Sequence, residues 1–285
     1  MNILITGANG QLGNALREAS NGSIHHYIFT DVEELDITSA VAVDEFIKRE
    51  EIEVMVNCAA YTAVDRAEDE VAVADKVNHL AVANLAKSCA KHNTTLIHIS
   101  TDYIFDGEAT SPYTEDSRPA PLNVYGKTKL AGECAIAESR CRHIVIRTSW
   151  LYSQFGHNFC KTMRRLSATE SSLRVVCDQV GTPTYAGDLA EAIVHIIESN
   201  QLSKCGIYNF SNEGVCSWYD FAVEIARLSG NTACEITPCR SEEYPTKAIR
   251  PRYSVLSKEK FSQSFSIEIA KWQESLKKCI ERLKE

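Results

Sequence analysis

The sequence predicts an α/β protein with a doubly wound parallel sheet and a smaller C-terminal lobe. Short β-forming runs alternate with helical stretches from residue 2 to about residue 212, and several of these runs are continuously apolar. The first run also ends at a cluster of glycines. Continuous apolar strands are typical of parallel sheets whose two faces are covered by helices. The alternation therefore indicates repeated strand–helix–strand units.

The residue pattern places each expected element in turn. We expect strands at residues 2–6, 26–31, 54–60, 95–100, 142–149, 174–178 and 206–211. We expect helices at residues 11–19, 39–50, 77–93, 127–139 and 186–199, and an amphipathic helix within 268–285. After residue 212 the alternation lapses into helix, loop and helix, which favours a second, smaller unit.

Composition and charge exclude several classes of protein. The 285 residues are 44% hydrophobic and 24% charged, as in a globular protein. The net charge of -8 argues against nucleic acid as a partner, because a phosphate backbone needs a basic face. No apolar run approaches the ~20 residues that span a bilayer. The eleven cysteines contain no CxxC pair, so we expect reduced thiols, no metal site and a cytoplasmic protein.

A glycine-rich turn follows the first expected strand. Gly7, Gly10 and Gly13 lie in "TGANGQLG", where the strand passes into a helix. Glycine is needed there because a Cβ would block the turn, the approach of a pyrophosphate and the packing of the helix. A plain turn with a helix cap is the alternative, but the position after an N-terminal strand favours dinucleotide binding. Three further turn residues are expected to line this site: Asn9, Gln11 and Leu12.

An acidic residue ends the second expected strand. Asp31 lies 18 residues beyond Gly13, where a carboxylate can accept hydrogen bonds from an adenosine ribose. Because a carboxylate repels a 2′-phosphate and no arginine follows nearby, electrostatics favours NADH over NADPH. Two alternatives stay open. In the first, Asp31 is only an ordinary loop or N-cap aspartate. In the second, Asp36, which is followed by Ile37, binds the adenine end of the cofactor.

The glycine turn gives the two expected units their roles. We assign residues 1–152 and 183–212 to a Rossmann-type dinucleotide-binding domain. Residues 153–182 and 213–285 are then the substrate-binding lobe, so the two units are interleaved in sequence. The active site is expected in the cleft between them, at the carboxyl ends of the strands.

A tyrosine and a lysine lie four residues apart in "YGKTK". On a helix, Tyr125 and Lys129 would share one face. A lysine ammonium near a phenol lowers the tyrosine pKa from about 10 toward neutrality, which makes the tyrosine a usable acid–base group. A solvated helical pair is the alternative. The hydroxyls of Ser100 and Thr101, in "ISTDYIFDG", could bind a carbonyl oxygen beside the pair.

Together these three elements resemble the short-chain dehydrogenase/reductase superfamily, in its extended, nucleotide-sugar branch. The resemblance covers nearly the whole chain, through "ILITGANGQLG", "VNCAAYTAVDRAE", "ISTDYIFDG", "YGKTKLAGE", "RTSWLYSQFGHNF", "DQVGTPTY" and "RPRYSVLSKEK". Within that branch the chain is similar to reductases of dTDP-linked 4-keto-6-deoxy sugars. The resemblance implies reduction of the C4 keto group of dTDP-4-dehydro-6-deoxy-L-mannose to dTDP-L-rhamnose, with NADPH or NADH as cofactor.

The resemblance also implies roles for individual residues. Tyr125 would protonate the C4 oxygen, Lys129 would bind the nicotinamide ribose, and Thr101 would hold the carbonyl oxygen. Three residues would line the cofactor: Ala59, Ala60 and Tyr61. Five would contact the substrate: Asp102, Tyr103, Trp150, Asn158 and Arg250. A core position for Trp150 stays open, and three residues match a family stretch without an assigned role: Val64, Asp65 and Glu68.

Three other functions are alternatives. Related dehydratases carry an Asp–Glu pair directly after the threonine, and here Tyr103 follows Asp102, which disfavours dehydration. An epimerase would use the same threonine, tyrosine and lysine with a retained NAD. A non-catalytic regulatory subunit with this fold need not keep Tyr125 and Lys129 together. We expect a monomer or homodimer, and although some relatives pair through Mg²⁺ on surface glutamates, no such residue is assigned here.

Overall fold

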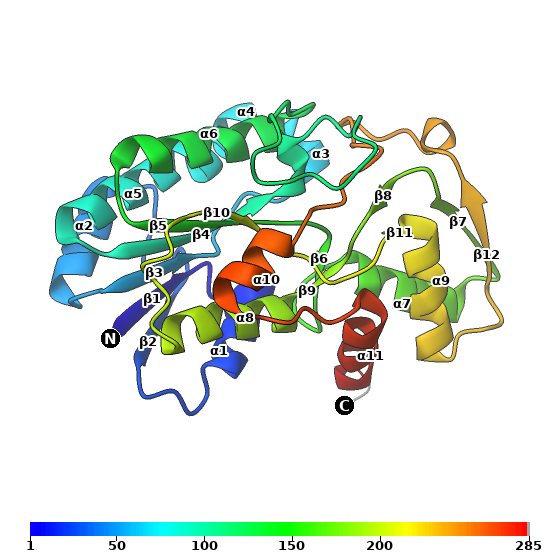
Figure 1. The fold of residues 1–285 in the computed structure, drawn as a ribbon. Coiled ribbons are helices and arrows are strands. Elements are labelled where there is room, and N and C mark those ends of the chain that lie inside the picture. The colour runs from blue at the N-terminus through cyan, green and yellow to red at the C-terminus, as the bar shows by residue number, and fades with distance from the viewer. Residues whose placement is uncertain (284–285) are drawn as a thin grey trace.

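The computed structural model describes residues 1–283 and is built around one six-stranded, all-parallel sheet (Figure 1). The strand order is β10-β5-β4-β3-β1-β2. The strands are β1 Asn2–Thr6, β2 His26–Thr30, β3 Val54–Asn57, β4 Thr95–Thr101, β5 His143–Thr148 and β10 Gly206–Asn209. The order reverses between β1 and β3, the position where ligands bind in doubly wound sheets. The predicted fold class is confirmed.

Six of the seven expected strands lie in this sheet, and the seventh does not. The strand expected at 174–178 corresponds to β7 Ser172–Val176, which pairs in parallel with β12 Glu235–Cys239 outside the main sheet. Its sequence pattern does not reveal this, because the pairing partner is distant along the chain. The strand expected at 54–60 also ends early, at Asn57.

Helices cover both faces of the sheet, as Figure 1 shows. One face is covered by α1 Gln11–Ala19, α8 Ala186–Glu198 and α10 Glu259–Phe265. The other is covered by α2 Ala40–Arg49, α5 Ala81–His92 and α6 Val124–Ser139. In β1, Ile3 and Ile5 belong to the first core and Leu4 to the second, as the alternation of side chains along a strand requires. All five helices expected up to residue 199 are present within a few residues.

The expected helix at 77–93 begins earlier and is not regular throughout. Two short helices, α3 Val64–Ala67 and α4 Val71–Asp75, precede it, and a π-helical turn, η1 Lys76–Leu80, joins α4 to α5. Asn78 of this turn accepts a hydrogen bond from the Tyr61 amide at 2.9 Å and donates one to the Tyr61 carbonyl at 3.0 Å. The turn therefore holds the segment that follows β3.

A smaller unit surrounds β7 and β12 (Figure 1). Its helices are α7 Phe159–Thr169, α9 Trp218–Ser229 and α11 Trp272–Arg282, which share a core rich in aromatic residues. The helix expected within 268–285 is α11, and residues 284–285 lie outside the described residues. The start of α9 is a capping box formed by Ser217 and Asp220, a signature that is visible in the sequence.

Short elements connect the two units. They are the pair β6 Leu151–Tyr152 and β9 Thr184–Tyr185, the pair β8 Val180–Gly181 and β11 Cys216–Ser217, and the 3₁₀ turns η2 Asp102–Ile104 and η3 Ser241–Glu243. Phe261 and Phe265 of α10 pack in the core of the main sheet. We therefore propose that α10 belongs with the sheet domain, although the expected division places it in the smaller lobe.

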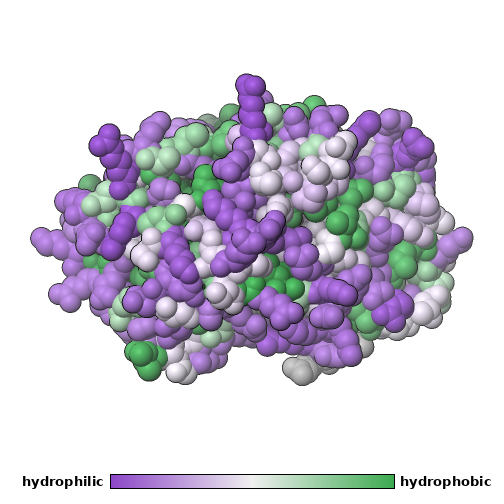
Figure 2. All heavy atoms as spheres, viewed as in Figure 1, coloured by the Kyte–Doolittle hydropathy of each residue, from purple (hydrophilic) through white to green (hydrophobic). Residues whose placement is uncertain are grey.

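The surface seen in Figure 2 is mainly hydrophilic, with small, scattered apolar areas. Within residues 1–283, no helix has both the length and the apolar character needed to cross a membrane.

Candidate active site

The glycine turn lies at the carboxyl end of β1, against the end of β3. Gly7 has a φ of +64°, and a Cβ on it would lie 2.6 Å from the Ala59 amide nitrogen. A Cβ on Gly13 would lie 2.5 Å from the Ala8 Cα. Both glycines are therefore required by close backbone approach. Helix α1 starts directly after Gly10, which has no side chain to cap its first amide groups, so these can bind an anion.

A hollow of about 410 Å³ opens beside this turn. It brings together seven of the predicted cofactor residues: Gly7, Gly10, Asp31, Asp36, Ile37, Ala59 and Ala60. Val77 of the π-helical turn also lines it, and the sequence analysis did not identify that residue. A concave site at the switch point of the sheet, bordered by a glycine turn, suits a dinucleotide.

The other predicted cofactor residues, among them Gln11, Leu12 and Tyr61, do not line the hollow. Leu12 is 3% exposed and packs in the core. Gln11 accepts hydrogen bonds from Ser153 Oγ at 3.0 Å and Asn158 Nδ2 at 2.9 Å. Tyr61 donates its hydroxyl to Glu70 at 2.5 Å. The side chains of Gln11 and Tyr61 thus stabilise the turns around the site.

The two acidic candidates differ in their surroundings. Asp31 accepts a hydrogen bond from the Asn9 amide at 2.9 Å, so its carboxylate lies against the glycine turn. Asp36 instead accepts bonds from the Thr38 hydroxyl at 2.7 Å and the Thr38 amide at 2.9 Å, and these bonds lower its pKa. Asp36 therefore stabilises a local turn, whereas Asp31 is tied to the glycine turn itself.

Helix α6 brings Tyr125 to the end of β4. Its N-cap, Asn123, accepts a hydrogen bond from the Gly126 amide at 2.8 Å. A Cβ on Gly126 would lie 2.1 Å from the Tyr103 carbonyl oxygen, so this first turn packs directly on η2. Tyr125 also meets Tyr103 edge-on, with ring centroids 5.6 Å apart. Burial raises the Tyr125 pKa, and a hydrogen bond with Thr101 offsets part of that rise.

Lys129 lies one turn further along α6 and is 2% exposed. Its Nζ donates to the Ile99 carbonyl at 2.6 Å and lies 3.4 Å from His98 Nε2. Burial lowers the pKa of Lys129 to about 8. The expected lowering of the Tyr125 pKa by Lys129 is wrong for this structure, because burial raises the pKa of the phenol.

The residues around Thr101 have separate partners. Ser100 donates to Glu133, and Glu133 forms a buried ion pair with Arg147 at 2.8 Å. The idea that Ser100 binds a carbonyl oxygen is therefore not supported by its hydrogen bonding. Thr101 Oγ1 donates to Asp102 Oδ1 at 3.1 Å, while Asp102 Oδ2 is buried without a partner. Burial raises the Asp102 pKa to about 7.

Arg250 reaches the site from the C-terminal part of the chain. Its Nη2 donates to Asp65 at 2.8 Å, and its Nη1 lies 3.4 Å from the Tyr103 hydroxyl. Its Nε is buried without a partner. Asp65 also accepts a bond from the Ala248 amide at 3.0 Å. The structure thus gives Asp65, which had no role from the sequence, the role of holding the Arg250 segment.

Glu68, the other acidic residue without an assigned role, contacts the first turn of α6. Its Oε1 accepts a hydrogen bond from the Val124 amide at 2.8 Å. Together with Asn123 it satisfies two of the first amide groups of the helix that carries Tyr125. Glu68 therefore helps to fix the position of Tyr125.

Trp150 and Asn158 lie where the smaller unit begins. Trp150 stacks on Trp218 with ring centroids 3.6 Å apart and has a φ of +49°. Backbone strain of this kind is concentrated at functional sites. Asn158 caps α7, because its Oδ1 accepts from the Lys161 amide at 3.0 Å. Its Nδ2 bonds to Gln11 and to the backbone of 153–155, so a diphosphate would have to displace existing partners.

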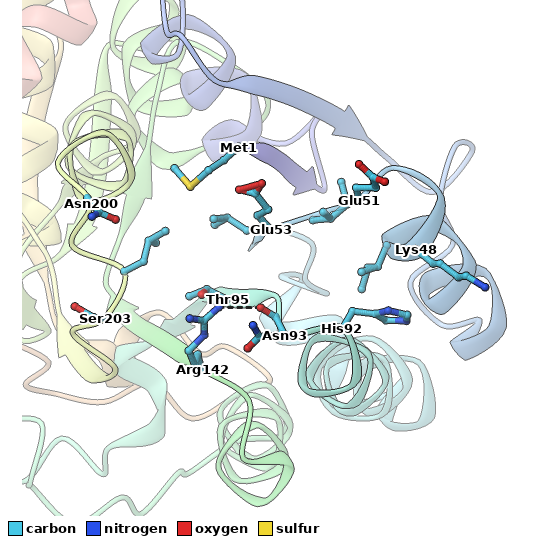
Figure 3. A pocket seen from close by; sticks show the side chains of 14 residues that line it. Met1, Lys48, Glu51, Glu53, His92, Asn93, Thr95, Arg142, Asn200 and Ser203 are labelled. Atoms are coloured by element: carbon cyan, nitrogen blue, oxygen red, sulfur yellow. Dashed lines mark hydrogen bonds between the residues drawn. The ribbon is translucent and has the colours of Figure 1, made fainter.

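A different hollow, of about 630 Å³, lies at the opposite end of the sheet (Figure 3). Met1, Glu53, Thr95 and Arg142 line it, and these residues lie at the amino ends of β1, β3, β4 and β5. Arg142 donates to the Asn93 carbonyl there at 2.8 Å. None of the predicted site residues lines this hollow, which separates it from the glycine turn.

A glycine turn at the switch point of a parallel sheet, with Thr101, Tyr125 and Lys129 at the adjacent strand end, defines an oxidoreductase of the short-chain dehydrogenase/reductase type. The family model described as the RmlD substrate binding domain matches residues 1–285. The chain belongs to this family.

Curated relatives cover nearly the whole chain. The dTDP-4-dehydrorhamnose reductase of Aggregatibacter actinomycetemcomitans is 41% identical, over 96% of this chain and 97% of that protein. The dTDP-4-dehydrorhamnose reductase of Mycolicibacterium smegmatis is 40% identical, over 98% of this chain and 84% of that protein.

Solved structures agree. A dTDP-4-dehydrorhamnose reductase from Clostridium acetobutylicum is 44% identical and has a TM-score of 0.96, with all of both chains covered. Another from Bacillus anthracis, in complex with NADP, is 37% identical with a TM-score of 0.93, over 99% of both chains. A UDP-glucose 4-epimerase from Thermus thermophilus, 19% identical with a TM-score of 0.85 over 100% of this chain and 99% of that one, shares the fold alone.

Proposed function

We propose that this chain is an NAD(P)H-dependent dTDP-4-dehydrorhamnose reductase, which reduces the C4 keto group of dTDP-4-dehydro-6-deoxy-L-mannose to give dTDP-L-rhamnose. One observation carries the proposal. Tyr125 of α6 is hydrogen-bonded to Thr101 at the end of β4, and Lys129 of the same helix bonds to the Ile99 carbonyl of β4, in a chain that is 41% identical to a curated reductase. The relatives named as reductases match the chain over its full length.

The residues around the glycine turn fit a dinucleotide. A Cβ on Gly7 or Gly13 would fill the space where the backbone comes closest, and no side chain at Gly10 caps the first amide groups of α1. When bound, the reduced nicotinamide supplies a hydride to C4 of the sugar. Lys129 would hold the nicotinamide ribose, and Asp31 the adenosine ribose.

Tyr125 would donate the proton that completes the reduction. The hydride and this proton together convert the C=O group into CH–OH, and the phenolate left on Tyr125 would then take up a proton from solvent. Burial keeps the phenol protonated at neutral pH, which suits a proton donor. The Thr101 hydroxyl would hold the carbonyl oxygen in line with the phenol.

Arg250, Tyr103 and Trp150 would contact the substrate. The Arg250 guanidinium has a buried Nε without a partner, so it has a donor left for a diphosphate, while its Nη2 already donates to Asp65. Trp150 would cover the sugar, supported by its stack on Trp218. For Asn158 we propose an indirect role, because its amide holds Gln11 and caps α7.

Cofactor preference is a finer part of the proposal. The carboxylate of Asp31 beside the glycine turn favours NADH, because it would repel a 2′-phosphate. The Bacillus anthracis relative was solved in complex with NADP, so we propose that both cofactors are used. In residues 1–283, no three His, Cys, Asp or Glu side chains cluster so that they could hold a metal ion. A cytoplasmic location and a monomeric or homodimeric state stay predictions.

Absorbance at 340 nm tests the proposal, with dTDP-4-keto-L-rhamnose formed in situ and NADPH or NADH added in parallel. We expect oxidation that depends on the keto sugar. Tyr125→Phe should reduce kcat by about 10²–10⁴-fold while it retains cofactor binding. Tyr244→Phe is the matched control, because Tyr244 is 59% exposed. If the wild-type protein binds a cofactor but oxidises neither NADPH nor NADH, an epimerase or a regulatory subunit becomes the better interpretation.

A further inference from the structure

A chain of buried polar side chains leads from β1 to Lys129. Thr6 Oγ1 donates to Asn57 Oδ1 at 2.7 Å, and Asn57 Nδ2 lies 3.0 Å from His98 Nδ1. His98 Nε2 in turn lies 3.4 Å from Lys129 Nζ. Thr6, Asn57 and His98 are at most 1% exposed. The mechanism proposed above uses Lys129 but none of these three residues.

A backbone amide fixes the direction of this chain. The Ala59 N–H donates to Asn57 Oδ1 at 3.2 Å, and an amide N–H cannot accept, so that atom must be the oxygen. The other atom is then the Asn57 NH₂, which makes His98 Nδ1 the acceptor. Burial lowers the His98 pKa well below its ordinary value, so its ring is neutral and carries one N–H. That N–H is therefore on Nε2, which faces Lys129.

The lysine nitrogen thus lies between an acceptor and a donor. It donates to the Ile99 carbonyl at 2.6 Å, while the His98 Nε2–H points at it. A neutral amine can accept a bond from this N–H through its lone pair, but an ammonium has no acceptor. The arrangement therefore favours the neutral form of Lys129.

The other groups around Lys129 do not reverse this preference. Directly after β3, the Cys58 thiol has a pKa raised to about 12 by burial, so it is uncharged. From α6, Tyr125 is protonated, and the Glu133 carboxylate is held by Arg147 of β5 through bonds of 2.8 to 3.2 Å. The nearby negative charge is therefore already paired.

We propose that His98 is a positioning residue, which sets the protonation state of Lys129 by presenting a fixed imidazole N–H to its nitrogen. The inference rests on the proposed function for its effect on turnover, because a protonated Lys129 would hold the nicotinamide ribose. Activity is then expected to fall as pH rises through the point where Lys129 loses its proton.

Two substitutions change the imidazole N–H that faces Lys129 in different ways. In His98→Asn, Oδ1 replaces Nδ1 as the acceptor for Asn57, and the N–H that faces Lys129 is lost. In Asn57→Asp, a carboxylate oxygen replaces the NH₂ and forces the ring proton onto Nδ1, so Nε2 becomes an acceptor for the ammonium. Both variants should raise the midpoint of Lys129 ionisation by about one pH unit or more, with Asn57→Asp the larger.

NMR of protein labelled with ¹³C and ¹⁵N in lysine measures the Lys129 midpoint without substrate. The Lys129 signal is identified by its loss in Lys129→Met. We expect a midpoint near pH 8 in the wild type and higher midpoints in both variants. In parallel, the alkaline limb of kcat against pH should move by the same amount. Thr94→Val is the matched control, because it removes a buried hydroxyl that bonds to Ile52 at the far end of the sheet.

Unchanged midpoints in the folded variants, or an equal shift in Thr94→Val, would overturn the proposal. If one variant does not fold, the other decides alone. Failure of the proposed function looks different. In that case the Lys129 midpoint shifts as expected, while wild-type protein shows no oxidation that depends on the keto sugar.

Discussion

At the scale of single residues, burial decides the chemistry of this site more than pairing of charges does. Lys129 and Asp102 are 2% and 1% exposed, and burial moves their pKa values toward neutrality from opposite sides, to about 8 and about 7. Tyr125 follows the same rule, because burial raises its pKa. Tyr125 is therefore neutral at neutral pH, whereas Lys129 and Asp102 change their charge within about one pH unit of it.

Asp102 carries a prediction for stability against pH. Its pKa in the folded protein, about 7, lies above the ordinary value of 3.8, so the folded state binds more protons between these values. The stability it contributes is complete below about pH 4 and is lost as pH rises through 7. Asp102→Asn should therefore be more stable than wild type at pH 8, by roughly 2–4 kcal/mol, and nearly equal at pH 4.

Urea unfolding of both proteins at pH 4, 6 and 8 measures this difference. A variant that is equally destabilised at all three values would show that Asp102 does not titrate in the folded protein.

At the scale of elements, the start of α6 is the part of the fold on which catalysis depends. Asn123 and Glu68 bind its first amide groups, and Gly126 allows the helix to pack on η2. Tyr125 is the second residue of this helix, so its position depends on the helix cap and on contacts from two other segments, those of Glu68 and η2. A fixed first turn is what keeps the phenol beside Thr101.

Loss of the α6 cap should therefore affect both stability and activity. We expect Asn123→Ala to cost about 1 kcal/mol in the free energy of unfolding, as other N-cap losses do. Because Tyr125 lies in the affected turn, kcat should fall by about tenfold. Ser39→Ala is the matched control, since Ser39 caps a different helix, α2, through the Ala42 amide; kcat is compared at saturating cofactor because the neighbouring Thr38 lines the cofactor hollow. An equal loss of kcat in both variants would contradict the argument.

At the scale of the whole molecule, the two units are tied together by buried polar contacts. Gln11 of α1 bonds to Ser153 and Asn158 at the start of the smaller unit. Asp188 of α8 accepts from Asn212 at 2.6 Å and from Ser275 of α11. Neither unit can separate without leaving such groups unpaired, so we infer that the described chain unfolds as one cooperative body.

The tryptophans test this cooperativity. Trp218 and Trp272 belong to the smaller unit and Trp150 packs against its core, so tryptophan fluorescence reports mainly on that unit. Circular dichroism at 222 nm reports on helices of both units. We expect the two signals to change at the same urea concentration. Fluorescence that changes at lower urea would show that the smaller unit unfolds independently.

Local patterns in the sequence determined the main sheet and its glycine turn. The helix at 11–19 is α1 to the residue, and β-forming runs predicted the six strands. Several of these runs are continuously apolar, because a strand that is covered by helices on both faces buries all of its side chains. The pairing of Tyr125 with Lys129 on one helix face also follows from their spacing alone. The sequence offered the hydroxyls of Ser100 and Thr101, family resemblance selected Thr101, and the structure places it at the end of β4.

Only the tertiary structure decided which groups meet across segments. The partner of β7 is β12, about sixty residues away, and Asp65, Glu68 and Trp218 act through contacts that no local pattern encodes. The ionisation of Lys129 and Tyr125 likewise depends on burial, which several distant segments create together. The physical reason is the same in each case. Spacing along the chain determines which face of a helix or strand a residue occupies. Packing determines how far its side chain is exposed to solvent and which groups it contacts.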